Sequence, residues 1–336
     1  MANQTPGVVF KNNQLGFKLS STVLENLTSE MLTAPKNKIV NGNYQGDVAG
    51  NFSVYVLRNN LYDPEEKILG ETKTEWIDDD DFLVENEVNS IDLKYLYEKQ
   101  IVIPTLLTMS LPTPTIDEYA KQVSQGLARS LDRSTLGEMI GACMQFSIAN
   151  ADKNVITVDD ASATYGEDLA SALGQAQVKL DEGMEGKDIT CPQADRFAIL
   201  ASEAYQAIID SGVNLNSNTG AEIQAFNKFY QNSFKDFNIF KAVPQILGKT
   251  KARYRTKADA PASTVVNKGV KAICGHNVAT TRAVDYSVGT RIVLSSEASK
   301  TNIIPLYRWG VKCLRPWFIV VVCTAAFLNT VKTAIG

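Results

Sequence analysis

Apolar positions recur every three to four residues through the middle of the chain, which is the pattern of an amphipathic helix. The recurrence is clearest over residues 115–149, at Ile116, Ala120, Val123, Leu127, Leu131, Leu136, Met139, Ile140 and Cys143. Thr115 is a suitable N-cap, because its hydroxyl can accept a hydrogen bond from a free N–H of the first turn. Such a helix would be about 50 Å long at 1.5 Å per residue. Gly126, Gly137 and Gly141 would allow another backbone to approach it, or would bend it.

The alternating stretch "NFSVYVLRNNLY", with Phe52, Val54 and Val56 on one side and Ser53, Tyr55 and Leu57 on the other, predicts a strand near the N-terminus. We expect a long hairpin over 43–85, with its return strand in "ETKTEWI" (71–77). A two-stranded hairpin has little core of its own, so it must lie on another surface. Ahead of it, residues 1–42 have the pattern of an extended arm with one short helix, whose apolar face holds Val23, Leu24, Leu27 and Met31.

Residues 160–300 alternate between helical and strand patterns, which predicts a compact α+β domain. The helical patterns are "EDLASALGQAQVKLDE" and "SEAYQAIIDSG", and the strand patterns are "RFAILA", "FNIFKAVP", "VKAICG" and "GTRIVLSS". Gly212 ends the second of these helices, since glycine readily adopts the left-handed backbone found after a helix.

The most apolar stretch, "LRPWFIVVVCTAAFL" (314–328), is either a buried strand or a membrane anchor. Only residues 316–331 separate Arg315 from Lys332, whereas a membrane-spanning helix needs about 20 apolar residues. The stretch is also rich in β-branched residues and begins at a proline, which favours a strand. The alternative is a soluble α+β domain anchored in a membrane by its C-terminus.

Composition excludes several classes of protein. The chain has 336 residues and a net charge of −4, so its overall charge gives no sign of a nucleic-acid binder. The N-terminus has neither the basic start nor the apolar run of a signal peptide. Five scattered cysteines, an odd number without paired spacing, predict reduced thiols rather than a disulfide framework.

Few residues suggest catalysis or metal binding. The consecutive acids Asp78, Asp79, Asp80 and Asp81 offer oxygen ligands for a hard cation, but neighbours on an extended chain point to opposite sides, which favours a solvated acidic turn. Gly248-Lys249-Thr250 is not a phosphate-binding loop, because Val243 stands where that motif needs glycine. His276 is the single histidine, and we expect it to have a local hydrogen-bonding role rather than to serve a hydrolase. The sequence therefore predicts no enzyme, no cofactor and no metal site.

The distribution of charge is more informative. Residues 63–85 contain ten acidic and two basic residues, whereas residues 249–282 contain eight basic residues and one acid. Within "GKTKARYRTK" the basic residues alternate, as on one face of an exposed strand: Lys249, Lys251, Arg253, Arg255 and Lys257. Three interpretations remain open, namely two solvated surfaces, complementary patches that meet between copies of the chain, or a basic lining that faces packaged nucleic acid.

Three stretches resemble a known family. One is the helix ending in Leu180-Asp181-Glu182 followed by a strand led by Arg196 and a helix with Tyr205; another is "FNIFKAVPQI", which turns at Pro244. The last is "YRWGVKCLRPWFIVVV", with Tyr307, Gly310, Arg315 and Pro316. Together with the order of the predicted elements, these stretches resemble the major capsid proteins of tailed bacteriophages, which have the Hong Kong 97-type fold.

The resemblance implies an α+β fold with four parts. These are an N-terminal arm (1–42), an E-loop hairpin (43–85), a peripheral domain with a spine helix (86–159 and 301–336, the helix at 115–149) and an axial domain (160–300). In this arrangement "RPWFIVVV" would be a core strand of the peripheral domain.

The resemblance also implies a function. The protein would form hexamers and pentamers of an icosahedral head around double-stranded DNA, with no membrane partner. Scaffolding and portal proteins would be its other partners, DNA contact would be non-specific, and the head would assemble in the host cytoplasm. An encapsulin-like compartment shell is the alternative within the same fold.

Overall fold

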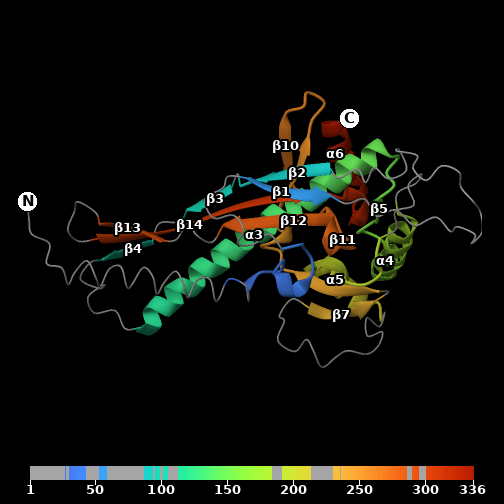
Figure 1. Cartoon of the computed structure of the whole chain (residues 1–336). Helices are drawn as coiled ribbons and strands as arrows, with labels where there is room; N and C mark the ends of the chain where they lie inside the picture. Colours follow the sequence, from blue (N-terminus) through green and yellow to red (C-terminus); the bar gives the residue numbers. More distant parts are fainter. Residues whose placement is uncertain are drawn as a thin grey trace, which may run out of the picture.

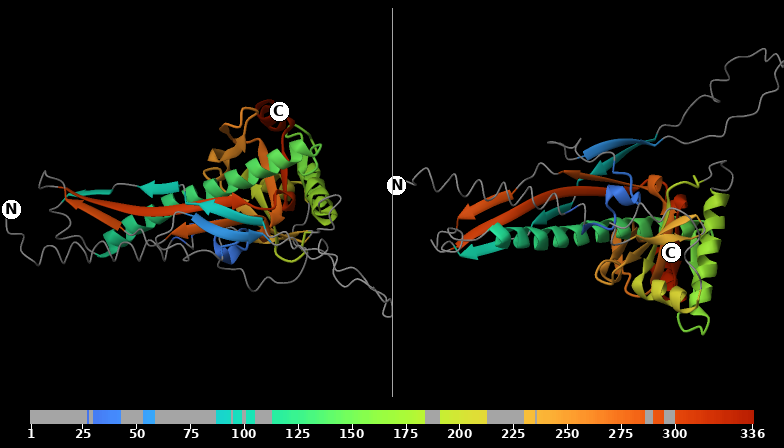
Figure 2. Two further views of the ribbon diagram at one scale, coloured as in Figure 1. Left: turned by 45° about the horizontal axis from the view of Figure 1, so that its top comes forward. Right: turned by 90° about the horizontal axis from the view of Figure 1, so that it is seen from below.

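The computed structural model describes residues 27, 30–42, 53–58, 87–93, 95–98, 101–104, 113–183, 191–212, 230–234, 236–285, 290–294 and 300–336. Figures 1 and 2 show a compact end, where helices surround a sheet, and a long thin region that extends from it. One helix, α3, runs through both parts. The predicted run Asp78–Asp81 and the predicted return strand 71–77 lie outside the described residues.

Helix α3 spans Thr113–Ala149, 37 residues, and is therefore about 55 Å long. The helix predicted over 115–149 is confirmed, but Thr115 is not its N-cap, because the helix already begins at Thr113. Its predicted apolar face is buried from Val123 to Cys143, with no more than 2% of any of these side chains exposed: Val123, Leu127, Leu131, Leu136, Met139, Ile140 and Cys143.

The compact end is built on a six-stranded sheet of order β5-β15-β11-β6-β8-β7. Its strands are β5 (Val155–Thr157), β6 (Arg196–Ala201), β7 (Tyr230–Phe234), β8 (Phe237–Ala242), β11 (Val270–His276) and β15 (Ile319–Cys323). Three helices accompany it, α4 (Tyr165–Glu182), α5 (Ser202–Asp210) and α6 (Ala325–Ile335). The strand and helix patterns predicted within 160–276 are thus confirmed.

The apolar C-terminal stretch supplies β15, an inner strand of this sheet. All five residues of β15 are buried, and the strand pairs with β11 on one side and with β5 on the other. The prediction of a buried strand is confirmed. Among the described residues, no helix combines the length and the apolar character needed to span a membrane.

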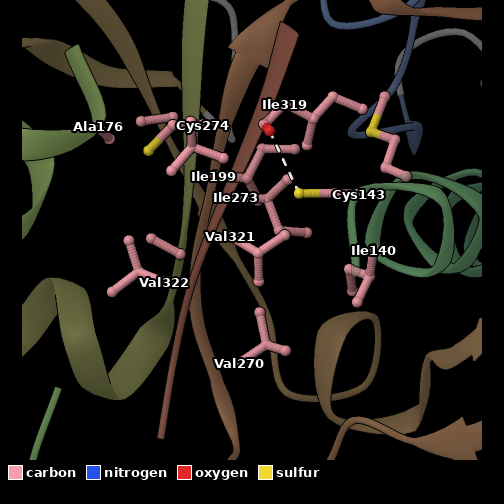
Figure 3. Close-up of a cluster of buried hydrophobic side chains, with 14 of the residues drawn as sticks. Ile140, Cys143, Ala176, Ile199, Val270, Ile273, Cys274, Ile319, Val321 and Val322 are labelled. Atoms are coloured by element: carbon pink, nitrogen blue, oxygen red, sulfur yellow. Dashed lines mark hydrogen bonds between the residues drawn. The ribbon is translucent and has the colours of Figure 1, made fainter. Parts of the chain in front are cut away.

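Apolar side chains fill both sides of this sheet. Figure 3 shows Ile140 and Cys143 of α3 on one side of the strands and Ala176 of α4 on the other. The Cys143 thiol donates a hydrogen bond to the Ile319 carbonyl oxygen at 3.2 Å (Figure 3). Strands that are covered on both sides read as continuous apolar runs, which explains the composition of β15.

The thin region is organised around β14 (Lys300–Cys313), a strand of 14 residues that runs beside α3. It pairs antiparallel with four shorter strands: β3 (Tyr95–Glu98), β4 (Ile101–Pro104), β12 (Thr280–Asp285) and β13 (Thr290–Leu294). A small apolar cluster, Ile91, Leu93, Ala283 and Leu314, lies beside it. Most of the other buried apolar residues belong to one large cluster around the six-stranded sheet.

These pairings differ in part from the predicted division at residue 300. Strand β15 was expected apart from residues 160–300, yet it pairs with β11. Strands β12 and β13 were expected with those residues, yet they pair with β14. Backbone pairing partners, rather than order along the chain, decide which sheet a strand joins, and the division into peripheral and axial domains stays a prediction.

Strand β1 (Ser53–Arg58) pairs antiparallel with β2 (Glu87–Asp92), from Ser53 opposite Asp92 to Arg58 opposite Glu87. The predicted strand in 51–62 is confirmed. Its described partner β2 lies beyond the predicted bound at 85, while the predicted return strand 71–77 stays a prediction.

In the described part of the chain, four short 3₁₀ helices connect the larger elements: η1 (Pro35–Asn37), η2 (Leu247–Lys249), η3 (Asn277–Ala279) and η4 (Pro316–Phe318).

Candidate functional site

The predicted basic segment forms a β-hairpin that projects from the compact end (Figure 1). Strand β9 (Lys251–Arg255) pairs antiparallel with β10 (Pro261–Val265). A hydrogen bond of 3.0 Å from the Thr256 N–H to the Ala260 carbonyl oxygen closes the connection. We call this unit, with the preceding Lys249, the basic hairpin.

Two glycines of helix α3 hold the basic hairpin in place. A Cβ atom at Gly141 would lie 1.5 Å from the carbonyl oxygen of Arg253, and one at Gly137 would lie 2.3 Å from that of Lys251. No side chain fits at such distances, so only glycine lets β9 approach the helix this closely. Two of the three glycines predicted to admit another backbone, Gly137 and Gly141, therefore do so. One edge of β9 pairs with β10, and its other edge lies against α3.

Side chains of β9 alternate between core and solvent, as in a half-buried strand. Ala252 and Tyr254 are buried in the large apolar cluster. Lys251 and Arg255 are exposed on the opposite face, and Arg253 between them is half-buried. Pairing places Val265, Ser263 and Pro261 of β10 opposite these three residues, and all of them are exposed. The face that the hairpin presents to solvent is thus basic along β9 and small or apolar along β10.

Four of the five predicted basic residues are exposed, namely Lys249, Lys251, Arg255 and Lys257. Arg255 has a partner in Asp259 at 3.9 Å, but both side chains are largely in solvent, at 70% and 87% exposure. Such a pair contributes little, because water screens it. Lys249, Lys251 and Lys257 form no ion pair with any described residue. The hairpin therefore carries net positive charge.

Two later basic residues of the same run lie in the interior. Lys271 of β11 is buried, with its ammonium group 2.9 Å from Asp160 Oδ2 and 5.6 Å from the centre of the Tyr165 ring. Arg282 of β12 is also buried. These two residues therefore add no charge to the exposed surface, although they belong to the same basic run of the sequence.

Arg282 belongs to a buried polar junction that attaches residues 31–41 to helix α3. The carboxylate of Asp132, fully buried on α3, accepts hydrogen bonds from the Leu32 N–H (2.9 Å), the Thr33 N–H (2.9 Å) and the Thr33 hydroxyl (2.6 Å). Arg282 donates to the Thr33 hydroxyl oxygen at 2.6 Å and to its carbonyl oxygen at 3.0 Å. We call Thr33, Asp132 and Arg282 the buried junction.

Burial raises the pKa of Asp132, while the hydrogen bonds from Thr33 and Leu32 and the charge of Arg282 oppose that rise. The sequence analysis missed this junction. A signal was present, since Asp132 directly follows Leu131 in the apolar pattern of α3 and a carboxylate there requires donors.

Arg196, a residue of the family resemblance, has a structural role at the start of β6. Its buried guanidinium lies 2.7 Å from the Asp181 carboxylate at the end of α4. It also donates to the carbonyl oxygens of Pro192 (2.9 Å) and Cys191 (2.7 Å). Gly310, another such residue, leaves room for β2, because a Cβ there would lie 2.4 Å from the Asp92 carbonyl oxygen. These matching residues fix the fold rather than a reaction centre.

His276 has the local role predicted for it. Its Nδ1 atom accepts a hydrogen bond of 3.3 Å from the Val278 N–H and caps η3. Burial lowers the pKa of His276, while a hydrogen bond with the Ala194 backbone and the charge of Asp195 raise it.

The cysteines are free thiols, and burial raises the pKa of Cys143 and Cys323 to about 12 and that of Cys191 to about 11. Thiols with such values stay protonated at neutral pH, which leaves them poor nucleophiles. Within the described ranges, His, Cys, Asp and Glu form no group that could hold a metal ion.

Comparison with solved structures gives neighbours of similar fold. No family model matches the chain, and no curated protein matches it. A chain of Mycobacterium phage Che8 superposes with a TM-score of 0.52 at 13% identity, covering 84% of this chain and 89% of the other. A chain of the mature capsid of bacteriophage PhiM1 superposes with a TM-score of 0.53 at 12% identity, covering 84% of both chains. A chain of the capsid of cyanophage P-SCSP1u superposes with a TM-score of 0.51 at 14% identity, covering 86% of both chains.

The chain has the Hong Kong 97-type fold. The predicted fold class is confirmed, and the likeness extends over most of the chain and most of each neighbour. Because one fold can serve many purposes, the likeness by itself does not assign a function.

Proposed function

We propose that this protein is the major head protein of a tailed bacteriophage, many copies of which assemble into an icosahedral shell around double-stranded DNA. The observation that carries the proposal is the fold, which matches phage capsid chains over 84–86% of this chain.

The form of the thin region supports an assembling protein. Among the described residues, β1 and β2 form a separate two-stranded sheet. Two-stranded sheets are marginally stable alone in water. Neighbouring copies in a symmetric shell would supply the missing contacts.

In this proposal the long helix α3 is the spine of a peripheral domain, the β1–β2 hairpin is the base of the E-loop, and the compact end is mostly the axial domain. Hexamers and pentamers are the assembling units. The protein acts with scaffolding and portal proteins, touches DNA without sequence preference, has no catalytic activity and needs no cofactor. It resides in the virion after assembly in the host cytoplasm.

The test is expression of the full-length chain, followed by size-exclusion chromatography and negative-stain electron microscopy. We expect closed shells, or rings of five and six subunits. Material that stays monomeric at high concentration, with and without its co-expressed scaffolding protein, would contradict the proposal.

An encapsulin-like compartment is the alternative function for this fold. The names of the three neighbours described above are those of phages, which favours the head protein. Particles purified from the natural source separate the two: DNA protected from nuclease supports a phage head, whereas a packaged enzyme and no DNA supports a compartment.

A further inference from the structure

We propose that the exposed face of the basic hairpin is a docking surface for the acidic segment 63–85 of a second copy of this chain. The inference rests on the proposed function, because it concerns contacts between copies in an assembly. It names the surface and its occupant, which the fold alone does not supply.

The first argument is unmatched charge. Lys249, Lys251 and Lys257 are exposed and form no ion pair with any described residue. Arg255 adds a further charge, which the solvent-exposed Asp259 at 3.9 Å compensates only weakly. Exposed charges of one sign attract a partner of the opposite sign and set its orientation more than they stabilise the subunit itself.

The second argument is that these charges have fixed positions. The backbone of β9 lies against Gly137 and Gly141 of α3, while Ala252 and Tyr254 are held in the core. Thr250, next to Lys249 and Lys251, is buried and donates its hydroxyl to the Ile246 carbonyl oxygen at 2.8 Å. A preorganised surface loses less conformational entropy when it binds than a flexible one does.

The third argument is the chemistry of the face. Lys251 and Arg255 stand opposite Val265 and Pro261 of β10, and 39% of Val265 is exposed. A suitable partner therefore combines carboxylates with apolar side chains. The segment 63–85 has this composition, with ten acidic and two basic residues. Its four consecutive aspartates, Asp78–Asp81, stand between Trp76-Ile77 and Phe82-Leu83-Val84.

The test uses charge reversal in the full-length chain. The hairpin variant carries Lys249→Glu, Lys251→Glu and Lys257→Glu, and the segment variant carries Asp78→Lys, Asp79→Lys, Asp80→Lys and Asp81→Lys. A matched control reverses three exposed charges elsewhere, Lys36→Glu, Lys121→Glu and Arg129→Glu. Assembly is measured by light scattering and electron microscopy, and folding by circular dichroism.

Each variant alone should raise the protein concentration needed for assembly about tenfold or more, which corresponds to about 1.4 kcal/mol, and should keep its circular dichroism spectrum. An equal mixture of the two variants should recover assembly, because each reversed hairpin then meets a reversed segment on the other copy. The control should assemble like the unaltered chain.

Several results would overturn the inference. If both variants assemble normally while the unaltered chain forms shells, the docking is wrong and the proposed function stands. If the unaltered chain itself does not assemble, the proposed function has failed instead. If combining both sets of changes in one chain restores assembly but mixing the two variants does not, the contact is within one subunit. If assembly is normal in both variants and only the hairpin variant retains less DNA, the hairpin faces nucleic acid.

Discussion

Helix α3 holds two charged parts of the chain in different ways, at the buried junction and at the basic hairpin. At the junction the charge of Asp132 is inside and provides the attachment, through three hydrogen bonds to residues 32 and 33. At the hairpin the attachment is close contact between backbones at Gly137 and Gly141, and the charges face water. Charge at the junction therefore serves folding, whereas charge at the hairpin lies in solvent.

The comparison predicts that removing the junction carboxylate has the largest effect on stability. Asp132→Ala should lower the free energy of unfolding by about 4 kcal/mol, because it leaves buried donors and the Arg282 charge unsatisfied. Asp132→Asn keeps one acceptor oxygen and should lose less. Urea unfolding followed by circular dichroism measures the stability of both variants. A loss below about 1 kcal/mol for Asp132→Ala would show that the carboxylate does not hold the junction together.

At the hairpin the sensitive position is a glycine and not a charge. Gly141→Ala should cost about 3 kcal/mol, since its Cβ would collide with the Arg253 carbonyl oxygen and push β9 away from α3. Gly248→Ala is the matched control, because its Cβ would have its nearest neighbour at 3.8 Å. Equal stability of the two variants would mean that α3 does not hold the hairpin in this way.

Salt should affect assembly through the exposed hairpin charges more than it affects folding through the buried junction. Raising the ionic strength from 0.1 M to 1 M shortens the screening length from about 10 Å to about 3 Å, so early assembly should slow several-fold if exposed charges guide it. The unfolding midpoint should change little, because buried charges are screened much less. Light scattering measures the rate of early assembly, and thermal unfolding measures the midpoint. Assembly that is indifferent to salt would point to apolar contacts between copies.

Reversing the hairpin charges should barely change folding. The variant with Lys249→Glu, Lys251→Glu and Lys257→Glu should unfold within about 0.5 kcal/mol of the unaltered chain, because these side chains are exposed and form no described ion pair. Urea unfolding at a concentration below that needed for assembly measures it. A loss comparable to that of Asp132→Ala would show that the hairpin charges stabilise the subunit after all.

His276 gives the smallest expected effect, a dependence of stability on pH. Its folded pKa lies below the unfolded value because burial disfavours the imidazolium. The unfolded chain therefore binds more protons, and stability should fall as the pH drops from about 7 through the folded pKa. His276→Asn keeps an acceptor for the Val278 N–H and should weaken this dependence. Unfolding at pH 7.5 and 5.5 measures it, and identical profiles would contradict the role.

The local pattern of apolar and polar residues was enough to predict most of the helices and strands named in the sequence analysis. Helix α3 is predicted to within two residues at its start, because its apolar period fits one face of a helix. The strands β6, β8, β11 and β15 are predicted because short apolar runs bounded by glycine, proline or polar residues are a local property. The alternating charge of β9 likewise shows its exposed face.

The sequence by itself determined which segments are helices and strands, which side chains of β9 face water, and where the acidic and basic segments lie. Only the tertiary structure decided that β1 pairs with β2, that β15 joins β11, and that Lys271 and Arg282 are inside while Lys251 and Arg255 are outside. The reason is how far apart along the sequence the interacting residues lie. Helical and strand periods arise from neighbours along the chain, whereas Arg282 and Thr33, 249 positions apart, meet only when the chain has folded.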